Sequence, residues 1–544
     1  MFKVKPLRAE WVTLIASLYL LIGFNSLLWQ HLASVLSADA HGLLLRVAFG
    51  VMILCAFNLV LTLLAFRPLL KPLLIALFMV SAAVAYFMSQ YGVMIDVGML
   101  RNAIETNAAE VRDLLSIKLF LYITVLGVLP SLLLYKTPLL YRNWARELFG
   151  KLLASVACVV VLAAVALMNY QGLASLFRNH HEIRLMLVPS NFVGASLGYV
   201  GERVGSAAKP FRSIGADAKL DAAWQQRTRK SLTVLVVGES ARAPNFGVLG
   251  YGRDTTPQLS KEQGLIAFTD VHSCGTETAV SVPCMFSGLT RKNYDASTAK
   301  NQEGLLDVLQ RAGLAVRWRD NQSGCKGTCD RVLFEDVSNL KDPALCADNE
   351  CRDEILLKGL DSFIDNLQQD TVLVLHQMGS HGPDYYKRYP QEYERFTPVC
   401  RSNALNQCSQ DSIVNAYDNT LVYTDHVLAS LIDILRSKQD KVDTAMLYLS
   451  DHGESLGEYN LFLHGTPYML APEQQKHVPL LAWFSDSYKA SFGIDSDCLQ
   501  QARNGPLSQD NLFHSMLGLL QVRTALYQPQ LDLFASCRPM LARH

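Results

Sequence analysis

The chain has 544 residues, 49 acidic and 49 basic side chains, and a mean hydropathy of +0.15. A chain of this length is expected to form more than one domain. A nucleic-acid-binding protein needs a basic face, so a formal net charge of zero argues against nucleic acid as the main partner. Nearly all the long apolar segments lie before Tyr170, which separates an apolar N-terminal part from a more polar C-terminal part.

Five uncharged apolar segments of the N-terminal part are candidates for membrane spans, because a helix needs about 20 apolar residues to cross the hydrocarbon core of a bilayer. The first segment is interpreted as a span and not a signal peptide, since no convincing cleavage site follows it and further spans come after it. We therefore predict a transmembrane domain over residues 1–170. Its spans are 11–30, 47–66, 72–88, 119–135 and 152–170.

The basic residues between these segments predict the orientation, because cytoplasmic loops carry the excess of Lys and Arg. Basic residues occur before the first span, after the second and after the fourth, which places the N-terminus in the cytoplasm. Everything after Tyr170 then lies outside the cytoplasm. The basic residues are Lys3, Lys5, Arg8, Arg67, Lys71, Lys136, Arg142, Arg146 and Lys151.

The cysteines support the same topology. Cys55 and Cys158 lie inside apolar segments and are expected to pack as small hydrophobic residues. The other ten lie in the C-terminal part, and an even number at close spacings indicates disulfides in an oxidising compartment. A structural zinc at Cys325, Cys329, Cys346 and Cys351 is the alternative. The expected pairs are Cys274–Cys284, Cys325–Cys329, Cys346–Cys351, Cys400–Cys408 and Cys498–Cys537.

Residues 171–230 are predicted to connect the two parts. Apolar residues recur at helical spacing over Leu173–Leu187, beside Arg178, His180, His181 and Arg184. This pattern fits a helix lying in the membrane interface, and it fits an ordinary surface helix equally well. Phe192–Val204 is expected to continue along the surface, and Gly205–Lys219 is rich in small residues and is interpreted as a linker.

Residues 231–544 are predicted to form a soluble domain in which amphipathic helices precede buried strands. Helices are expected at 303–312, 352–367 and 413–437, each followed by a strand, at 315–319, 372–376 and 445–449. A further strand at 479–484 and a helix at 510–520 complete the pattern. Alternating strands and helices predict an α/β fold with a mainly parallel sheet that is covered by helices on both faces.

Candidate metal ligands follow two of the buried strands. Glu239 comes directly after the strand that ends at Val237-Gly238, and Asp451 and His452 follow the strand 445–449. Ligands of open α/β sheets bind outside the carboxyl ends of strands. Two carboxylates and an imidazole suit a divalent ion, with zinc as the best match and manganese as the alternative. The other interpretation of Asp451 is a helix or turn cap.

The loop between Cys274 and Cys284 contains the candidate nucleophiles. Its hydroxyl groups belong to Thr276, Thr278 and Ser281, and the residues alone do not distinguish them. A hydroxyl bound to a metal ionises more easily than a free one, which would allow it to attack phosphorus near neutral pH. Equally, any one of these hydroxyls could serve only to cap the helix that follows.

Two further histidines are held between glycine, proline and small residues. They are His381 and His464, and we expect them to bind a second metal or to protonate a leaving oxygen. Lys326 is a candidate phosphate ligand or a solvated surface lysine. His376, at the end of the strand 372–376, is expected to pack and not to bind metal.

Together these segments resemble the lipid A phosphoethanolamine transferases of Gram-negative inner membranes. The similarity extends over the whole chain, including five N-terminal spans and five disulfides, and it implies an alkaline phosphatase/sulfatase-like fold for the soluble domain. This chain has Ser240 where most relatives have threonine. The segments are Gly238-Glu239-Ser240, the Cys274–Cys284 loop with Thr278, Ser380-His381-Gly382-Pro383, Ser450-Asp451-His452-Gly453-Glu454-Ser455 and Leu463-His464-Gly465-Thr466-Pro467.

The resemblance also implies roles for particular residues. Thr278 would be the nucleophile, and Glu239, Thr278, Asp451 and His452 would bind one catalytic zinc. His381 and His464 would contact a second zinc or the phosphoethanolamine group, which Lys326 and Ser323 would also approach. Asn102, Thr106 and Glu110 resemble residues that bind the lipid substrate; if the segment is helical, their spacing of four places them on one face.

The function that the resemblance implies is transfer of phosphoethanolamine from phosphatidylethanolamine to a phosphate of lipid A. The reaction would pass through a phosphoethanolamine-threonine intermediate and release diacylglycerol, and the modified envelope would bind polymyxins less tightly. The protein would work as a monomer in the bacterial inner membrane, with its catalytic domain in the periplasm. The alternatives are a lipopolysaccharide core sugar or periplasmic glucan as acceptor, a membrane-bound phosphatase or sulfatase, and a receptor with a structural metal.

Overall fold

The computed structural model describes residues 6–36, 39–105, 111–112, 114–180, 182–207, 210–347, 350–403 and 405–538. The chain divides into two compact units. One comprises Met1–Leu100 and Leu115–Gly198, and the other comprises Arg101–Leu114 and Tyr199–His544. We call them the N-terminal unit and the C-terminal unit.

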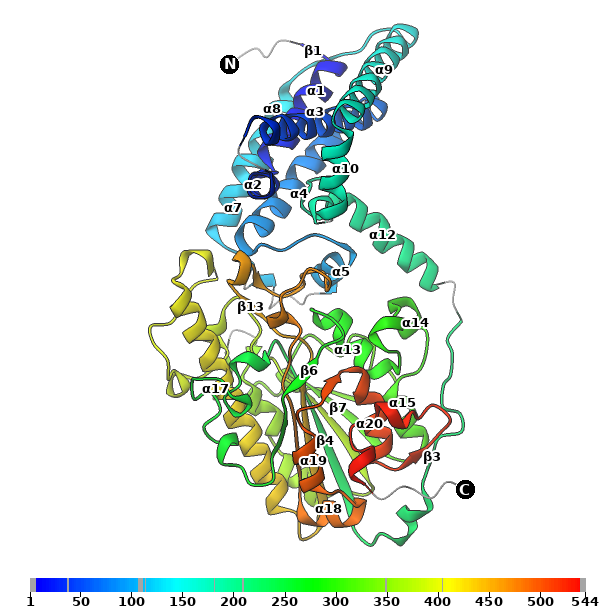
Figure 1. Cartoon of the computed structure of the whole chain (residues 1–544), viewed down its shortest axis with the longest axis vertical. Helices are drawn as coiled ribbons and strands as arrows, with labels where there is room; N and C mark the ends of the chain where they lie inside the picture. The colour runs from blue at the N-terminus through cyan, green and yellow to red at the C-terminus, as the bar shows by residue number, and fades with distance from the viewer. Residues whose placement is uncertain are drawn as a thin grey trace. The chain divides into compact units, whose positions relative to one another are not determined.

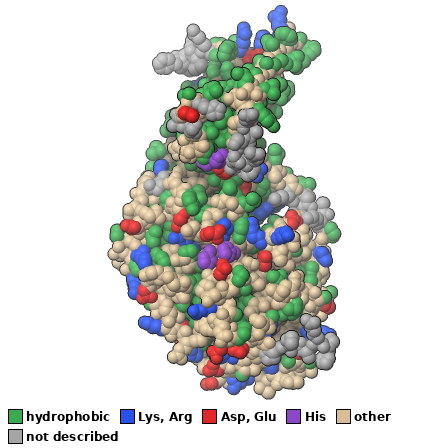
Figure 2. Space-filling model, viewed as in Figure 1, with side chains coloured by type: hydrophobic (Ala, Val, Ile, Leu, Met, Phe, Trp, Pro, Cys, Tyr) green, Lys and Arg blue, Asp and Glu red, His purple; other side chains and the backbone are tan. Residues whose placement is uncertain are grey.

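The N-terminal unit is built from apolar helices. Among the described residues, four spans are long and apolar enough to cross a membrane, and a bent pair makes a fifth. Many of their large apolar side chains are exposed, and Figure 2 shows such side chains over much of this unit's visible face. The helices are α1 (Ala9–Gly23), α2 (Ser26–Val35), α3 (Ala40–Leu63), α4 (Leu70–Tyr91), a continuous span of α7, a π-helical turn and α8 (Ile117–Lys136), and α9 (Trp144–Met168).

The first predicted span, 11–30, is bent in the structure and consists of two helices. Helices α1 and α2 meet at 62°. Asn25 lies between them and is buried; its amide nitrogen donates to the carbonyl oxygens of Leu20 and Val188, and its carbonyl oxygen accepts from the Val188 amide. An asparagine side chain that binds backbone groups in this way competes with the helix, which accounts for the break.

The connector is more helical, and more interrupted, than expected. Instead of one helix over 173–187, the structure has α10 (Tyr170–Asn179) and α11 (Ile183–Met186). Helix α12 (Ser190–Ala207) then extends into the segment that was interpreted as a linker. The break follows His180, whose backbone lies outside the helical region with φ −129° and ψ 69°.

A seven-stranded sheet forms the centre of the C-terminal unit (Figure 1). Its strand order is β5-β15-β12-β4-β11-β7-β8. The five strands from β12 to β8 are parallel, whereas β15 runs antiparallel to both of its neighbours. The predicted, mainly parallel α/β sheet is therefore confirmed. The bounds are β4 Lys230–Gly238, β5 Ile266–Phe268, β7 Ala315–Asp320, β8 Leu333–Asp336, β11 Thr371–His376, β12 Val442–Ser450 and β15 Leu480–Phe484.

Helices cover both faces of this sheet, with α17 on one side and α15 and α20 on the other (Figure 1). The helix predicted at 352–367 is wrong as one element: a 3-10 turn at Asp353–Leu357 is followed by Gly359, whose φ of +74° ends one helix before α16 begins. The bounds are α13 Thr278–Ser287, α14 Ala296–Lys300, α15 Leu305–Arg311, α16 Leu360–Asp365, α17 Gln410–Ser437, α18 Asp486–Phe492, α19 Ser496–Ala502 and α20 Asp510–Leu519.

The remaining regular elements are short. Helix α5 comprises Val97–Glu105. The short strands are β1 Leu7–Arg8, β2 Leu139–Leu140, β3 Lys219–Leu220, β6 Asp270–His272, β9 Cys346–Ala347, β10 Glu350–Cys351, β13 Ser455–Leu456, β14 Phe462–Leu463, β16 Pro506–Ser508 and β17 Val522–Arg523.

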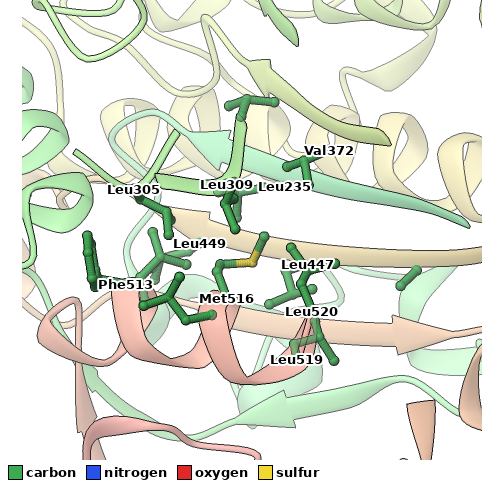
Figure 3. Packing of buried hydrophobic residues seen from close by; sticks show 14 of the residues in the cluster. Leu235, Leu305, Leu309, Val372, Leu447, Leu449, Phe513, Met516, Leu519 and Leu520 are labelled. Carbon is green, nitrogen blue, oxygen red and sulfur yellow. The ribbon is translucent and has the colours of Figure 1, made fainter. Parts of the chain in front are cut away.

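The main hydrophobic core lies between the sheet and the pair α15 and α20. Leu447 and Leu449 of β12 and Leu235 of β4 contribute the sheet side, and Figure 3 shows them facing the residues of the two helices. Burial of each leucine contributes about 2 kcal/mol. The core makes the sheet a rigid support for the loops at the carboxyl ends of its strands. The helix side comprises Leu305, Leu309, Phe513 and Met516, with Leu519 and Leu520 at the end of α20.

His514 of α20 is expected to make this unit less stable in mild acid. Burial lowers the pKa of His514 to about 4, and its Nδ1 accepts a hydrogen bond from the Gln528 amide. The unfolded chain binds the proton near pH 6.5, so stability is present above that pH and is lost as the pH falls toward 4. At pH 5 the expected loss is about 1 to 2 kcal/mol.

The measurement is the thermal unfolding midpoint of the full chain in detergent at pH 7.5 and pH 5. Asparagine at position 514 retains an acceptor near the Nδ1 position but does not titrate. His514→Asn is therefore expected to reduce the acid-induced decrease in Tm by a few degrees. An identical decrease in both proteins would show that His514 does not contribute.

Candidate functional site

The strand order brings the predicted metal ligands to one edge of the sheet. Strand β4 lies between β12 and β11, with Gly238 opposite Ser450 and Val237 opposite His376. The Asp451 amide donates to the Gly238 carbonyl oxygen over 2.9 Å. Glu239 and Asp451 therefore follow the ends of two adjacent parallel strands that are in register. This pairing brings together residues more than 200 positions apart in the sequence.

Four polar side chains converge at this edge. The Thr278 hydroxyl lies 3.0 Å from Oε2 of Glu239 and 3.3 Å from Nε2 of His452. The same His452 nitrogen lies 3.3 Å from Oε1 of Glu239 and 3.4 Å from Oδ2 of Asp451. Glu239, Asp451 and His452 are wholly buried, and Thr278 is 4% exposed. The structure thus brings together the three candidate ligands suggested by the residues themselves and Thr278, which the resemblance adds.

The chemistry of these donors fits a divalent cation. Two buried carboxylates lie next to each other, and Oδ2 of Asp451 has no hydrogen-bond partner among the described residues. Nδ1 of His452 lies 2.8 Å from the Gly453 carbonyl oxygen, so that nitrogen carries the proton and Nε2 presents a lone pair toward the carboxylates. Burial of unpaired negative charge is costly, and a cation held by these ligands would offset the cost.

The charges at the site perturb the pKa values in opposite directions. Burial raises the pKa of Asp451, and repulsion from Glu239 raises it further, to about 6. Burial also opposes ionisation of Glu239, but attraction to His452, His381 and His464 outweighs it and lowers the pKa of Glu239 to about 2. The two carboxylates therefore share one electrostatic environment that disfavours a double negative charge.

The structure distinguishes the three candidate nucleophiles. Thr278 is the first residue of α13, and its hydroxyl faces Glu239 and His452. The Thr276 hydroxyl donates to the Thr466 carbonyl oxygen, and the Ser281 hydroxyl accepts from the Gly275 amide within the loop. These two hydroxyls have structural partners, so Thr278 is the one that faces the cluster of ligands.

His464 and His381 lie beside the same cluster. The ring of His464 is 4.4 Å from that of His452 and 5.4 Å from that of His381. Nδ1 of His464 lies 2.8 Å from Oε2 of Glu454. Burial lowers the pKa of His464, but the Glu454 carboxylate more than offsets this and raises the pKa to about 9. His452, Glu454 and His464 form a second group of donors within 4.8 Å of one another.

The remaining predicted site residues lie in different places. The ammonium group of Lys326 donates to the Ser323 hydroxyl over 2.8 Å, and both residues line one pocket with Ala279, the neighbour of Thr278. His376 is buried and lies 2.8 Å from Asp320, as expected for a residue that packs at the strand end. Asn102 lies in α5. Thr106 and Glu110 lie outside the described residues.

Several residues that support the site were not recognised from the sequence. The Gln322 amide donates to Oε2 of Glu239, and Tyr385 donates its hydroxyl to Glu454. Gln509 connects two segments: its amide nitrogen donates to the carbonyl oxygens of Ser450 and Asp451, and its oxygen accepts from the Cys274 amide. Glu454 lies within a recognised motif, whereas the glutamines and Tyr385 have no local sequence signal.

Removal of the Gln509 side chain is expected to impair catalysis more than stability. Gln509 is 1% exposed and fixes the backbone of Asp451 relative to the loop that contains Thr278. Loss of such a supporting contact typically lowers activity or metal affinity 10- to 100-fold. The prediction is a decrease of that size in kcat for Gln509→Ala. The matched control is Gln500→Ala, since Gln500 donates to the Leu265 carbonyl oxygen and accepts from Arg503 but contacts no residue of the site; equal activity in both variants would contradict the prediction.

The cysteines of the C-terminal unit are all paired. The five disulfides join the pairs that we expected from their spacing, namely Cys274–Cys284, Cys325–Cys329, Cys346–Cys351, Cys400–Cys408 and Cys498–Cys537. The alternative of a structural zinc at Cys325, Cys329, Cys346 and Cys351 is wrong, because these four form two disulfides. Cys55 and Cys158 are free thiols.

Comparison with known proteins identifies the family. Residues 231–522 match the sulfatase family, and residues 53–204 match the family described as phosphoethanolamine transferase EptA/EptB. The chain is 43% identical over 532 residues to phosphoethanolamine transferase EptA of Escherichia coli K12, covering 96% of both chains. The chain belongs to the phosphoethanolamine transferase EptA family.

Two further relatives support this assignment. The solved integral membrane protein lipooligosaccharide phosphoethanolamine transferase A from Neisseria meningitidis superposes with a TM-score of 0.95 at 36% identity. The match covers 98% of this chain and 100% of that one. Phosphatidylethanolamine transferase Mcr-1 of Escherichia coli is 42% identical over 460 residues, covering 82% of this chain and 84% of Mcr-1. The predicted sulfatase-like architecture is confirmed, with both units present.

Proposed function

We propose that this protein transfers phosphoethanolamine from phosphatidylethanolamine to a phosphate of lipid A. The observation that carries the proposal is the position of the Thr278 hydroxyl, 3.0 Å from Glu239 and 3.3 Å from His452, in a buried site with a third potential ligand, Asp451. The activities named for the relatives, phosphoethanolamine and phosphatidylethanolamine transferases, supply the donor group.

The reaction proceeds in two displacements. Thr278 gives up its hydroxyl proton, and its oxygen attacks the phosphorus of phosphatidylethanolamine; the bond to diacylglycerol breaks, and its oxygen takes a proton. A phosphate oxygen of the acceptor then attacks the phosphoethanolamine-threonine, which regenerates the Thr278 hydroxyl. Zinc bound by Glu239, Thr278, Asp451 and His452 would lower the pKa of the hydroxyl and offset the negative charge that develops on the transferred phosphoryl group.

The surrounding residues bind and orient the donor group. Thr278 begins α13, so the free amides of that helix end favour a phosphate at the hydroxyl. Lys326, held by Ser323, adds a positive charge at the pocket that Ala279 also lines. His464 and His381 are placed to hold a proton for the leaving diacylglycerol or to bind a second zinc. The Glu454 carboxylate fixes the orientation of the His464 ring.

We also propose where the protein acts. Residues 1–170 form the transmembrane domain, with the N-terminus in the cytoplasm, and 171–230 form the interfacial connector. Residues 231–544 form the periplasmic catalytic domain. The disulfides are consistent with that compartment. Both substrates are lipids, so attachment to the membrane keeps a monomeric enzyme at its substrates, and Asn102, Thr106 and Glu110 are proposed to contact the lipid.

Intact-protein mass spectrometry after incubation with phosphatidylethanolamine and zinc tests the proposal. The native chain is expected to gain the mass of one phosphoethanolamine group, and addition of lipid A is expected to remove it and to yield modified lipid A. Rapid release of phosphoethanolamine or inorganic phosphate with unmodified lipid A would identify a hydrolase. Transfer to a core sugar or a periplasmic glucan, with lipid A unmodified, would reassign the acceptor.

A further inference from the structure

Three potential metal ligands lie together in the N-terminal unit, among residues that the proposed reaction does not use. His31 belongs to α2, His180 follows α10, and Glu182 precedes α11. Nε2 of His31 and Nδ1 of His180 each lie 3.0 Å from the same oxygen, Oε1 of Glu182. All three donor atoms lie within 4.8 Å of one another, and the two imidazole rings meet edge to face, 5.7 Å apart.

This set of donors has the composition of a zinc site. Two imidazoles and one carboxylate form the protein ligand set of open zinc sites, in which the fourth position holds water. Ligands at about 2.0 to 2.2 Å from a tetrahedral ion are roughly 3.3 to 3.5 Å apart, so the observed 3.0 Å requires only a small outward movement. The side chains are only 15% to 29% exposed.

The backbone around these residues is held in place independently of any metal. The buried Asn25 side chain, six residues before His31, binds both the amide and the carbonyl oxygen of Val188, six residues after Glu182. Both contacts join the start of α2 to the segment after α11. Helices α2 and α11 are therefore fixed next to each other, and the backbone itself brings the three donor groups together.

We propose that His31, His180 and Glu182 bind a zinc ion that joins α2 to the connection between α10 and α11. The ion would have three protein ligands and one water, and it is separate from the residues assigned to catalysis. In the proposed topology, His31 lies at the end of the first span and His180 follows the fifth. The ion would thus connect the first and the last membrane-spanning segments on the periplasmic side.

Zinc content per chain tests this proposal. The full-length protein in detergent is stripped with a chelator, reloaded with zinc chloride, desalted and analysed by mass spectrometry for metal. His31→Gln and His180→Asn keep an amide near the ring nitrogen that faces Glu182 but remove the strong ligand. Each is expected to bind one zinc fewer than the native chain. Glu182→Gln, which is nearly isosteric, is expected to lose the same equivalent.

The matched control is His426→Gln in the C-terminal unit, where His426 lies 3.2 Å from Oε1 of Glu354 at a similar exposure, 23%. It is expected to retain the full zinc content. Equal zinc content in the native chain and in folded Glu182→Gln would overturn the proposal and leave a hydrogen-bonded cluster. Should the histidine variants not fold, the zinc content of Glu182→Gln decides the question by itself.

Zinc-dependent thermal stabilisation gives a second readout in protein that lacks the catalytic ligand Asp451. In an Asp451→Ala background, zinc is expected to raise the Tm, because an ion that binds only the folded state stabilises it. Addition of Glu182→Gln to that background is expected to remove most of this rise. An unchanged rise in the double variant would place the stabilising ion elsewhere and contradict the assignment.

Discussion

Thr278→Ala is expected to abolish phosphoethanolamine transfer, with a decrease in kcat of at least about a thousandfold. The alanine removes the attacking oxygen and one of the four grouped metal ligands, and no other hydroxyl of the loop faces the cluster. Thr278→Ser retains the oxygen without the methyl group, so it is expected to keep measurable activity. The measurement combines the rate of lipid A modification with the mass of the intact chain after incubation with phosphatidylethanolamine.

Ser281→Ala is the matched control for that experiment. The Ser281 hydroxyl is buried in the same disulfide-closed loop but accepts from the Gly275 amide and does not face Glu239. This variant is expected to form the adduct and to retain most of the native activity if the loop keeps its conformation. A phosphoethanolamine adduct on folded Thr278→Ala would exclude Thr278 as the nucleophile, and absence of the adduct from folded Ser281→Ala alone would assign that role to Ser281.

The sequence predicted where the candidate metal ligands lie because strand ends are local features. Glu239 and Asp451 each follow a short apolar run, whose length favours a buried strand. Parallel pairing then brings their ends to one edge. The identity of the nucleophile depends on side-chain direction within an irregular loop. Thr276, Thr278 and Ser281 lie within six positions, and the sequence does not distinguish their hydroxyls. In the structure only Thr278 begins α13 with its hydroxyl facing Glu239.

What the sequence did not reveal depends on contacts between distant segments. Gln509 lies 58 residues from Asp451 and 235 from Cys274, and its side chain forms hydrogen bonds with the backbone of both. A glutamine directly before a helix has no sequence pattern that indicates this role. The break at Asn25 likewise depends on Val188, 163 residues away. Hydropathy predicts that a segment can cross a membrane, but it does not detect one polar side chain that ends a helix.

Removal of the metal is the second large effect that we expect. Chelation is predicted to lower activity more than a thousandfold and to lower the Tm by several degrees, because it leaves two adjacent carboxylates buried without a cation. Zinc is expected to restore both quantities. Magnesium is expected to restore little, since it prefers six oxygen ligands in octahedral geometry and an imidazole suits it poorly.

Asp451→Asn tests the contribution of the Asp451 charge to metal binding. The amide keeps the size of the side chain but removes one of the two buried negative charges, so this variant is expected to be inactive. Chelator is expected to lower its Tm less than that of the native chain, and the remaining decrease is the part that the proposed ion at His31, His180 and Glu182 contributes. Asp443→Asn is the control: Asp443 lies on the same strand, β12, but is paired with Arg227. It is expected to lose stability and still respond to chelator as the native chain does. If chelator lowers the Tm of Asp451→Asn as much as that of the native chain, the stabilising ion does not depend on Asp451 and the proposed ligand set is wrong.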